Sequence, residues 1–220
     1  MSEVMKKIFV MFGILSSILL IASCSLKSPM IIANPEQQTG TKNFRQWCQE
    51  INSVSASSRY TINILLKKAN TENCQEASFK LNKLTSIELY GSKIIDLKPL
   101  SSLISLTRIS LDSNQINDVK PLTSLVNLQY LSLYSNQIND IKPLTNLINL
   151  HYLFLGKNEI TNVKPLSKLV KLIYLSISYN QIDDVKSLTS LINLTGLDLT
   201  GNKTTKKDCP VQPEICRFDD

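Results

Sequence analysis

The sequence predicts an α/β solenoid with a parallel β-sheet on its concave face, short helical turns on its convex face and a helical N-terminal cap. The first observation is a repeat: six leucines stand 22 residues apart and each begins the same pattern. They are Leu84, Leu106, Leu128, Leu150, Leu172 and Leu194. An asparagine and a proline recur at fixed places in most copies. A constant period of about 20 to 29 residues is typical of stacked turns that cannot bury their apolar side alone.

The first half of each repeat has the alternation of a β-strand. We number the positions of a repeat from its leucine, so that positions 4 and 6 of the third copy are Leu131 and Leu133. These face the core, whereas positions 3, 5 and 7 point outward. Six such strands, stacked roughly 4.8 Å apart, would form a curved sheet about 25 Å long. Together with the leucine spacing, this predicts a leucine-rich-repeat solenoid over residues 84–202, with five full repeats and a truncated sixth.

Position 9 predicts a ladder of hydrogen bonds inside the solenoid. An amide both donates and accepts, so it can serve backbone groups of its own turn and of the next. The ladder residues are Asn114, Asn136, Asn158, Asn180 and Asn202, with Ser92 in the first copy. In the second half of the repeat, four prolines suit the first residue of a short helical or 3-10 turn on the convex side. They are Pro99, Pro121, Pro143 and Pro165.

The segments that flank the repeats predict caps. Residues 41–83 have a helical pattern, in which Phe44, Trp47, Cys48 and Ile51 share one face. We expect Trp47 and Phe79 to cover the open end of the core. Residues 203–220 predict a small disulfide loop at the other end.

Four cysteines lie outside the repeats, two before them and two after. An even number in an exported chain indicates disulfides. Because a solenoid holds its ends apart, Cys48 is expected to pair with Cys74, and Cys209 with Cys216. A zinc site made by all four cysteines is less favoured, since it requires the two ends to meet and neither pair has C-x-x-C spacing.

The N-terminus predicts export. Lys6 and Lys7 precede an apolar run over residues 8–22, which is typical of a signal peptide ending at residue 23. The sequence Ile21-Ala22-Ser23-Cys24 resembles a bacterial lipobox, which predicts that Cys24 is lipidated and that residues 24–40 form a tether. Ser25 resembles the pattern of lipoproteins sent to the outer membrane of Gram-negative cells. The alternative is an ordinary signal peptide with an accidental cysteine.

The composition argues against catalysis. The chain has one histidine, His151, and no nucleophile, carboxylate set or Gly-rich loop beyond what the repeat explains. We therefore expect no enzyme activity, no cofactor and no metal. The net charge of +6 is not evidence of nucleic-acid binding. A row of lysines, one per repeat, shares its turns with aspartates, which favours a solvated convex edge over a polyanion site.

The concave face is the candidate site. Position 3 carries three tyrosines on adjacent strands, and other aromatic residues stand nearby at positions 5, 7 and 8. The predicted ligand-binding residues are Arg108, Tyr130, Tyr134, Tyr152, Phe154, Tyr174 and Tyr179. Aromatic pairs across strands can be purely structural. Exposed Tyr beside Arg is also the composition of a protein-binding surface, and we favour this interpretation.

Repeats such as L-Q-Y-L-S-L-Y-S-N-Q-I-N-D-I-K-P-L-T-N-L-I-N, residues 128–149, resemble those of internalins and of related phosphatase-regulating repeat proteins. The resemblance covers residues 84–202 and implies that the concave face binds another protein. This chain departs from the pattern in its disulfide caps, in its small number of repeats and in the lack of a following immunoglobulin-like domain or cell-wall anchor. These departures do not favour a role in host-cell invasion.

The sequence as a whole predicts a monomeric, lipid-anchored envelope protein that binds a protein or peptide ligand. Two rival interpretations are a passive structural component of the envelope and a glycan-binding surface protein.

Overall fold

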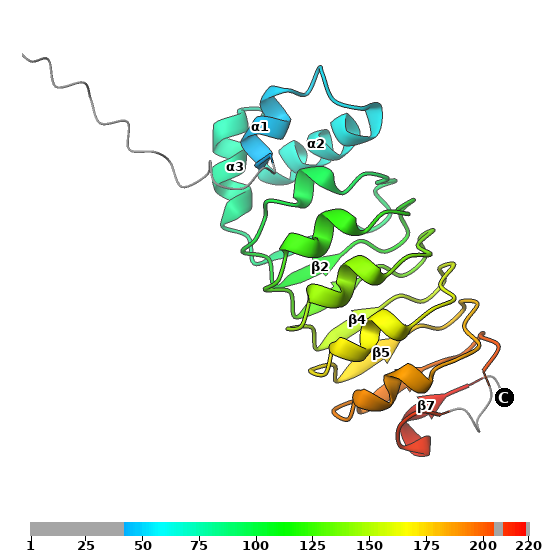
Figure 1. Cartoon of the computed structure of the whole chain (residues 1–220). Coiled ribbons are helices and arrows are strands. Elements are labelled where there is room, and N and C mark those ends of the chain that lie inside the picture. Colours follow the sequence, from blue (N-terminus) through cyan, green and yellow to red (C-terminus); the bar gives the residue numbers. More distant parts are fainter. Residues whose placement is uncertain (1–41, 205–208, 219–220) are drawn as a thin grey trace, which may run out of the picture. The chain divides into compact units, whose positions relative to one another are not determined.

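The computed structural model describes residues 42–204 and 209–218. The predicted signal peptide, the lipidation site at Cys24 and the tether up to residue 40 lie outside the described residues. The described part is a leucine-rich-repeat solenoid, in which similar turns stack one on another after a group of three helices (Figure 1).

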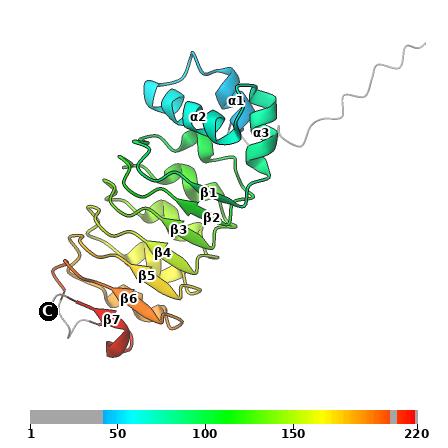
Figure 2. The ribbon, with the colours of Figure 1, turned by 180° about the vertical axis from the view of Figure 1, so that it is seen from behind.

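One parallel sheet forms the concave side of this solenoid, and its seven strands follow the order of the sequence (Figure 2). The strands are β1 (Ser86–Glu88), β2 (Arg108–Ser110), β3 (Tyr130–Ser132), β4 (Tyr152–Phe154), β5 (Tyr174–Ser176), β6 (Gly196–Asp198) and β7 (Cys216–Arg217). From β1 to β6, each residue pairs with the same position of the next repeat, as Tyr130 does with Tyr152. The side chains of one position therefore form a column across the sheet.

Strand β7 is the one element of the sheet that the repeat does not predict. It belongs to the C-terminal disulfide segment, where the short 3-10 helix η8 (Pro213–Ile215) and the Cys209–Cys216 bond precede and fix it. The Leu199 N–H donates to the Arg217 carbonyl at 2.9 Å. This segment thus covers the edge of β6, which would otherwise leave its backbone groups unpaired.

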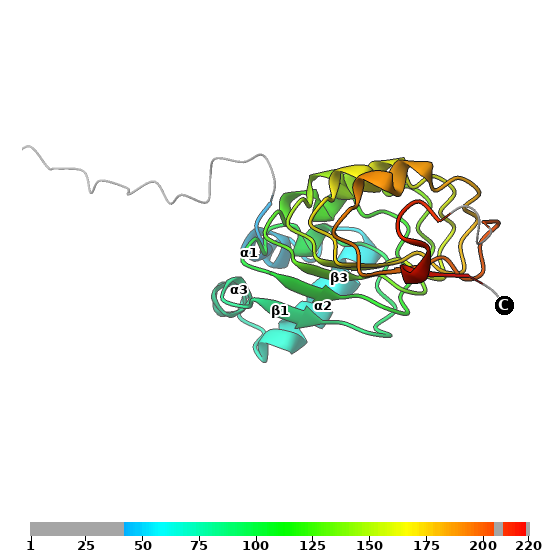
Figure 3. The same cartoon turned by 90° about the horizontal axis from the view of Figure 1, so that it is seen from below.

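Short 3-10 helices line the opposite, convex side (Figure 3). They are η2 (Lys98–Leu100), η3 (Lys120–Ser124), η4 (Lys142–Asn146), η5 (Lys164–Lys168) and η6 (Lys186–Ser190). The prolines occupy the second residue of these helices, so the prediction that they come first was wrong by one place. The backbone N–H of the first residue is not free: in η3 the Lys120 N–H donates to Asp118 Oδ1 at 2.8 Å. The aspartates of the convex edge are therefore helix caps as well as charges.

The leucines and isoleucines of both halves meet in one continuous core that runs the length of the solenoid. Within each complete turn the apolar residues at positions 4, 6, 11, 14, 17 and 20 are buried, as Leu131 and Leu133 are in the third, and position 1 is buried in every complete turn after the first. Because neighbouring turns share this core, no turn has to bury its apolar side alone.

The position-9 asparagines form the hydrogen-bond ladder. The Asn158 amide nitrogen donates to the carbonyls of Leu155 in its own turn and of Leu133 in the preceding turn, both at 3.0 Å. Its Oδ1 accepts the Ile138 N–H at 3.0 Å. The side chain bridges to the preceding turn rather than to the following one that the sequence suggested. Ser92 takes no part and donates instead to the Tyr90 carbonyl.

A second, external asparagine ladder was not predicted. The Asn127 amide donates to the Ile104 carbonyl, Asn149 to Val126 and Asn193 to Val170, at 2.8 to 2.9 Å. In the fourth copy Lys171 stands at this place and its Nζ donates to Asn149 Oδ1 at 2.8 Å. These bonds fix the loops that lead from the convex helices back into the strands.

Three helices cap the first repeat: α1 (Phe44–Gln49), α2 (Ala56–Ala69) and α3 (Cys74–Asn82). The Cys48–Cys74 disulfide joins α1 to the start of α3. Thr61 Oγ1 in α2 donates to the Asp96 carbonyl at 2.8 Å, which ties the cap to the first repeat.

The large side chain that seals the cap is Phe44, which is fully buried, whereas Trp47 is partly buried. The expectation that Phe79 covers the core was wrong, because its side chain is 60% exposed. In α3 the buried face is formed by Ala77, Ser78 and Leu81, so position 79 falls on the outer side. The Lys83 ammonium stands 3.9 Å above the Phe79 ring.

No helix within the described residues is long and apolar enough to span a bilayer.

The internal ladder gives a stability prediction. Asn158→Ala removes the partners of two carbonyls and one N–H, so we expect a loss of about 1 to 3 kcal/mol of unfolding free energy in urea or thermal denaturation. Asn146→Ala is the matched control, because Asn146 is exposed on η4, and it should change stability by less than about 0.5 kcal/mol. Equal midpoints for the two variants would contradict the ladder's role.

Candidate functional site

Four aromatic rings form a contiguous row across the middle of the concave sheet. We call Tyr130, Tyr152, Phe154 and Tyr174 the aromatic row. The ring centroids of Tyr130 and Phe154 are 5.4 Å apart, as are those of Phe154 and Tyr174, and Tyr130 and Tyr152 are 6.3 Å apart. All three pairs are tilted and lie in the range of favourable aromatic contacts. The row joins three strands through side chains that point away from the core.

Arg108 closes the N-terminal end of the aromatic row. It is the first residue of β2 and pairs with Tyr130 in the sheet register. Its guanidinium carbon lies 3.5 Å from the centre of the Tyr130 ring, which is a close cation–π stack. A stacked guanidinium keeps its N–H donors available at its edge.

A second group, the rim cluster, comprises Tyr134, Lys157 and Tyr179 in the loops that follow the strands. The Lys157 ammonium stands 5.5 Å from the centre of the Tyr134 ring and 5.7 Å from that of Tyr179. A hydrogen bond with the Tyr134 hydroxyl, and to a lesser degree the electrostatic effect of both tyrosines, raises the pKa of Lys157 above its ordinary value. The two tyrosines therefore favour the charged form of Lys157.

Three glycines make room for tyrosine rings of this face. A Cβ built on Gly156 would lie 2.9 Å from the Tyr134 ring, one on Gly196 2.7 Å from Tyr174, and one on Gly201 2.5 Å from Tyr179. In each pair the glycine holds the same repeat position as the tyrosine, one copy later. A tyrosine followed after 22 residues by a glycine is thus the sequence signal of a ring that lies flat across the next turn.

Position 8 has a left-handed backbone in every copy. The φ angles are positive at Gly91, Ser113, Ser135, Lys157, Tyr179 and Gly201, and that of Tyr179 is 52°. Only glycine adopts this conformation without strain, and a bulky residue there costs about 1 to 2 kcal/mol. Lys157 and Tyr179 of the rim cluster are therefore held in an unfavourable conformation.

Two aspartates of this face, Asp112 and Asp198, are already engaged in hydrogen bonds. Asp112 accepts hydrogen bonds from the Ser132 hydroxyl and, at 2.8 Å, from the Tyr134 N–H. Asp198 accepts from Ser176 at 3.0 Å and from the Thr200 N–H at 3.2 Å. Ser132 and Ser176 are buried although their position points outward. Asp112 and Asp198 thus hold hydroxyl and backbone N–H groups of the same face, whereas the cations of Arg108 and Lys157 contact aromatic rings.

The geometry brings all seven predicted site residues onto one side of the sheet or its rim. Tyr152 and Tyr179 remain 42% and 53% exposed. His151 lies directly before β4 and is half-buried. Within residues 42–204 and 209–218, no three His, Cys, Asp or Glu side chains are grouped so as to hold a metal ion.

The comparisons with known proteins agree with this architecture. A family model described as Leucine Rich repeats, two copies, matches residues 126–169. Internalin C2 of Listeria monocytogenes is similar with a TM-score of 0.50 and 26% identity, covering 71% of this chain and 91% of that chain. A leucine-rich-repeat protein of Leptospira interrogans is similar with a TM-score of 0.55 and 29% identity, covering 66% of this chain and 39% of that one. No curated protein sequence matched.

The fold and its repeats define a leucine-rich-repeat protein. Internalins are among its structural neighbours. Proteins with this solenoid generally act as scaffolds that bind other proteins on an extended concave surface, and generally not as enzymes.

The left-handed position 8 gives a test of what Tyr179 contributes. Tyr179→Gly relieves about 1 to 2 kcal/mol of backbone strain but adds about 0.5 to 1 kcal/mol of chain entropy, so unfolding free energy should stay level or rise by about 1 kcal/mol. Ser135→Gly, at φ 57°, is the matched control without an aromatic ring and should behave alike in thermal denaturation. A loss of stability confined to Tyr179→Gly would show that its contact with Gly201 supports the fold.

Proposed function

We propose that this protein binds a protein or peptide ligand through the aromatic row and the rim cluster. The observation that carries the proposal is the arrangement of Tyr130, Tyr152, Phe154 and Tyr174 in contact on adjacent strands while Tyr152 stays substantially exposed. Tyrosine and arginine are the residues that most often dominate binding energy at protein interfaces.

The rings are pre-organised for this task. The Arg108 guanidinium stacks on the Tyr130 ring and holds it in place. The absence of a side chain at Gly196 and Gly156 leaves space that the rings of Tyr174 and Tyr134 occupy. Side chains already fixed in the free protein lose little entropy on binding, which favours affinity. A protein that served only as a spacer would gain nothing from fixed, exposed aromatic rings. Polar residues at position 3 would give the same sheet a more soluble surface.

The rim cluster supplies polar recognition beside the apolar row. Arg108 and Lys157 present donors on two sides of the aromatic surface, roughly 15 to 20 Å apart as judged from two strand spacings and five residues along the strand direction. Backbone carbonyls and carboxylates of a ligand are suitable acceptors. Apolar rings bordered by charged groups are the usual composition of an interface core and its rim.

The same protein is proposed to be exported and anchored by a lipid at Cys24, as a monomer in the bacterial envelope and on the outer membrane if the cell is Gram-negative. The lipobox Ile21-Ala22-Ser23-Cys24 and the apolar run before it support the proposal. The two disulfides also suit an oxidising compartment.

The concave site is tested by ligand capture. Tyr130→Ser/Tyr152→Ser/Tyr174→Ser should lose partners that the wild-type protein retains from an envelope extract, by at least about tenfold, because hot-spot tyrosines cost about 2 kcal/mol or more when truncated. Tyr152→Ser alone should give a smaller loss. Tyr60→Ser is its matched control, because Tyr60 lies on α2 and is 43% exposed against 42% for Tyr152.

Bound material is identified by mass spectrometry and by glycan staining. Retention of the same proteins by wild type and triple variant would refute the concave site. Capture that survives protease treatment of the extract but not glycosidase treatment would replace the protein ligand with a glycan.

The lipid anchor has its own test. Cys24→Ser should leave an unlipidated and unprocessed precursor, because the cysteine is the residue that carries the acyl chains. The measurement is incorporation of a labelled fatty acid, with mass analysis of the N-terminus, and Ser25→Ala serves as the neighbouring control. Normal cleavage and unchanged membrane retention of Cys24→Ser would disprove the assignment.

A further inference from the structure

A stripe of exposed aliphatic side chains runs along one long edge of the solenoid. The residues are Ile104, Val126, Ile148, Val170 and Ile192, and we call them the aliphatic flank. All five stand at position 21 of their repeats, and they are 45% to 81% exposed. At the spacing of stacked strands the stripe is about 20 Å long.

Folding does not require apolar residues at these places. The leucine directly before each one is fully buried, as Leu147 is before Ile148. The backbone that follows is held by the external ladder, in which the Asn149 amide donates to the Val126 carbonyl at 2.9 Å. The side chain at position 21 must therefore point outward whatever its chemistry. Single exposed aliphatic residues are ordinary, but a contiguous row of five marks an interaction surface.

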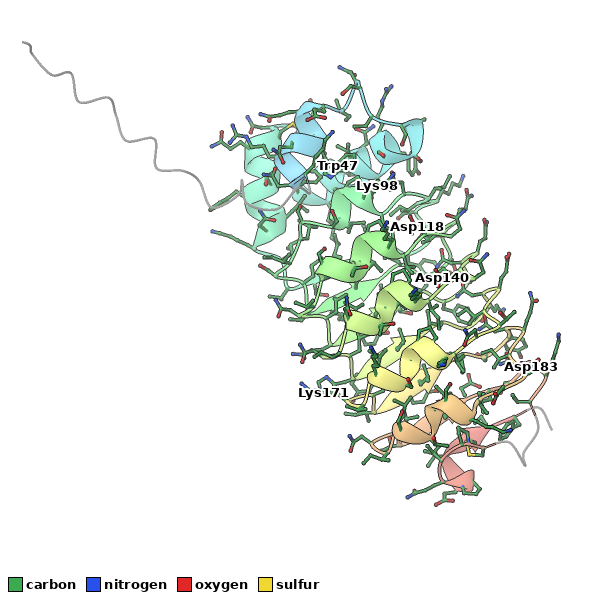
Figure 4. The ribbon with its side chains drawn as sticks, viewed as in Figure 1. Trp47, Lys98, Asp118, Asp140, Lys171 and Asp183 are labelled. Atoms are coloured by element: carbon green, nitrogen blue, oxygen red, sulfur yellow. A yellow bond between two sulfur atoms is a disulfide. The ribbon has the colours of Figure 1, made fainter. Side chains whose placement is uncertain are left out.

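Within the repeats, the charges beside the aliphatic flank are of one sign. The segments that form this edge are 100–107, 122–129, 144–151, 166–173 and 188–195, and they contain no Asp or Glu. They do contain Lys168 and Lys171. Asp118, Asp140 and Asp184 lie on the opposite edge, beside the lysines that begin the 3-10 helices, whereas Asp112 and Asp198 lie on the concave face. Figure 4 shows Lys171 on one long edge and Asp183 on the other.

We infer that the aliphatic flank lies on an anionic lipid bilayer. Aliphatic side chains enter the region between headgroups and acyl chains, while lysines beside them meet lipid phosphates. Because the repeat segments of this edge carry no carboxylate, they can approach such a membrane with little repulsion. A second copy of the chain is a poorer occupant, since five half-exposed side chains offer roughly 400 Å², about half of what each partner of a stable interface buries.

This surface is separate from the concave site, and it gives the domain an orientation. The flank is the edge between the sheet and the 3-10 helices, so a domain that lies on it leaves the aromatic row clear of the lipid. Five aliphatic residues and two lysines bind weakly by themselves. The proposed anchor at Cys24 would add its own affinity, because a tethered surface meets the bilayer at high effective concentration.

Vesicle sedimentation tests the inference with the chain 25–220, which keeps both disulfides and every described residue but carries no acyl chain. It should bind mixed vesicles that contain phosphatidylcholine and phosphatidylglycerol in equal amounts. Its binding to vesicles of phosphatidylcholine alone should be weaker. Val126→Ser/Ile148→Ser/Val170→Ser should reduce the partition coefficient at least about tenfold. Lys168→Gln/Lys171→Gln should remove the preference for phosphatidylglycerol, by about fivefold for each lysine.

Tyr152→Ser is the matched control, because it removes exposed apolar surface from the concave face and should bind vesicles as wild type does. Circular dichroism and thermal denaturation verify that the variants are folded, which is expected since every changed residue is exposed. The inference is overturned if the wild type does not bind above background, if the triple serine variant binds equally well, or if Tyr152→Ser abolishes binding. It is also overturned if sedimentation equilibrium shows a dimer that only the triple serine variant dissociates.

Discussion

Each repeat is tied to the one before it by an asparagine side chain that lies inside the turn, and the rest of the structure depends on this link. The Asn180 amide donates to Leu155 and Ile177 carbonyls, and its Oδ1 accepts the Ile160 N–H, with distances of 2.9 to 3.0 Å. The tight bend after each strand would otherwise bury backbone groups without partners. Each link joins position 9 of one copy to positions 6 and 11 of the copy before it. Because this pairing is the same in every turn, it fixes the register of the sheet, and the register places equal positions in columns.

The columns explain why a short segment can build a broad surface. A strand of three residues exposes few side chains, yet equal positions lie side by side over several turns. Arg108, Tyr130, Tyr152 and Tyr174 form such a column in adjacent strands. The residues that differ between copies are therefore free to specialise, since the core does not contact them. Positions 3 and 5 carry the aromatic row, and position 21 carries the aliphatic flank on a different surface.

The repeat made the fold predictable from the sequence, because the positions that decide it recur five or six times and agree. Strands, 3-10 helices, the internal ladder and the concave place of Tyr130, Tyr152 and Tyr174 all follow from the phase of the leucines. Features outside the period were harder to predict. Phe79 was misplaced because the buried face of α3 is formed by Ala77, Ser78 and Leu81, and two of these three residues are small and give only a weak apolar pattern. Strand β7 could not be foreseen, since its pairing with Leu197 and Asp198 comes from tertiary contact.

Within the site, the sequence identified residue types but not their geometry. The left-handed backbone of Tyr179 and the glycine beneath its ring become visible only when consecutive copies are set in contact. The same contact explains why Asp112, which stands among the aromatic residues, is no ligand for a partner: its oxygens already hold Ser132 and the Tyr134 backbone. A left-handed backbone thus recurs at position 8 of every copy, and in the rim cluster it falls on the large side chains of Lys157 and Tyr179. The residues of the ligand surface vary between copies, whereas the residues of the core do not. The specificity of the surface can therefore change one column at a time without loss of the fold.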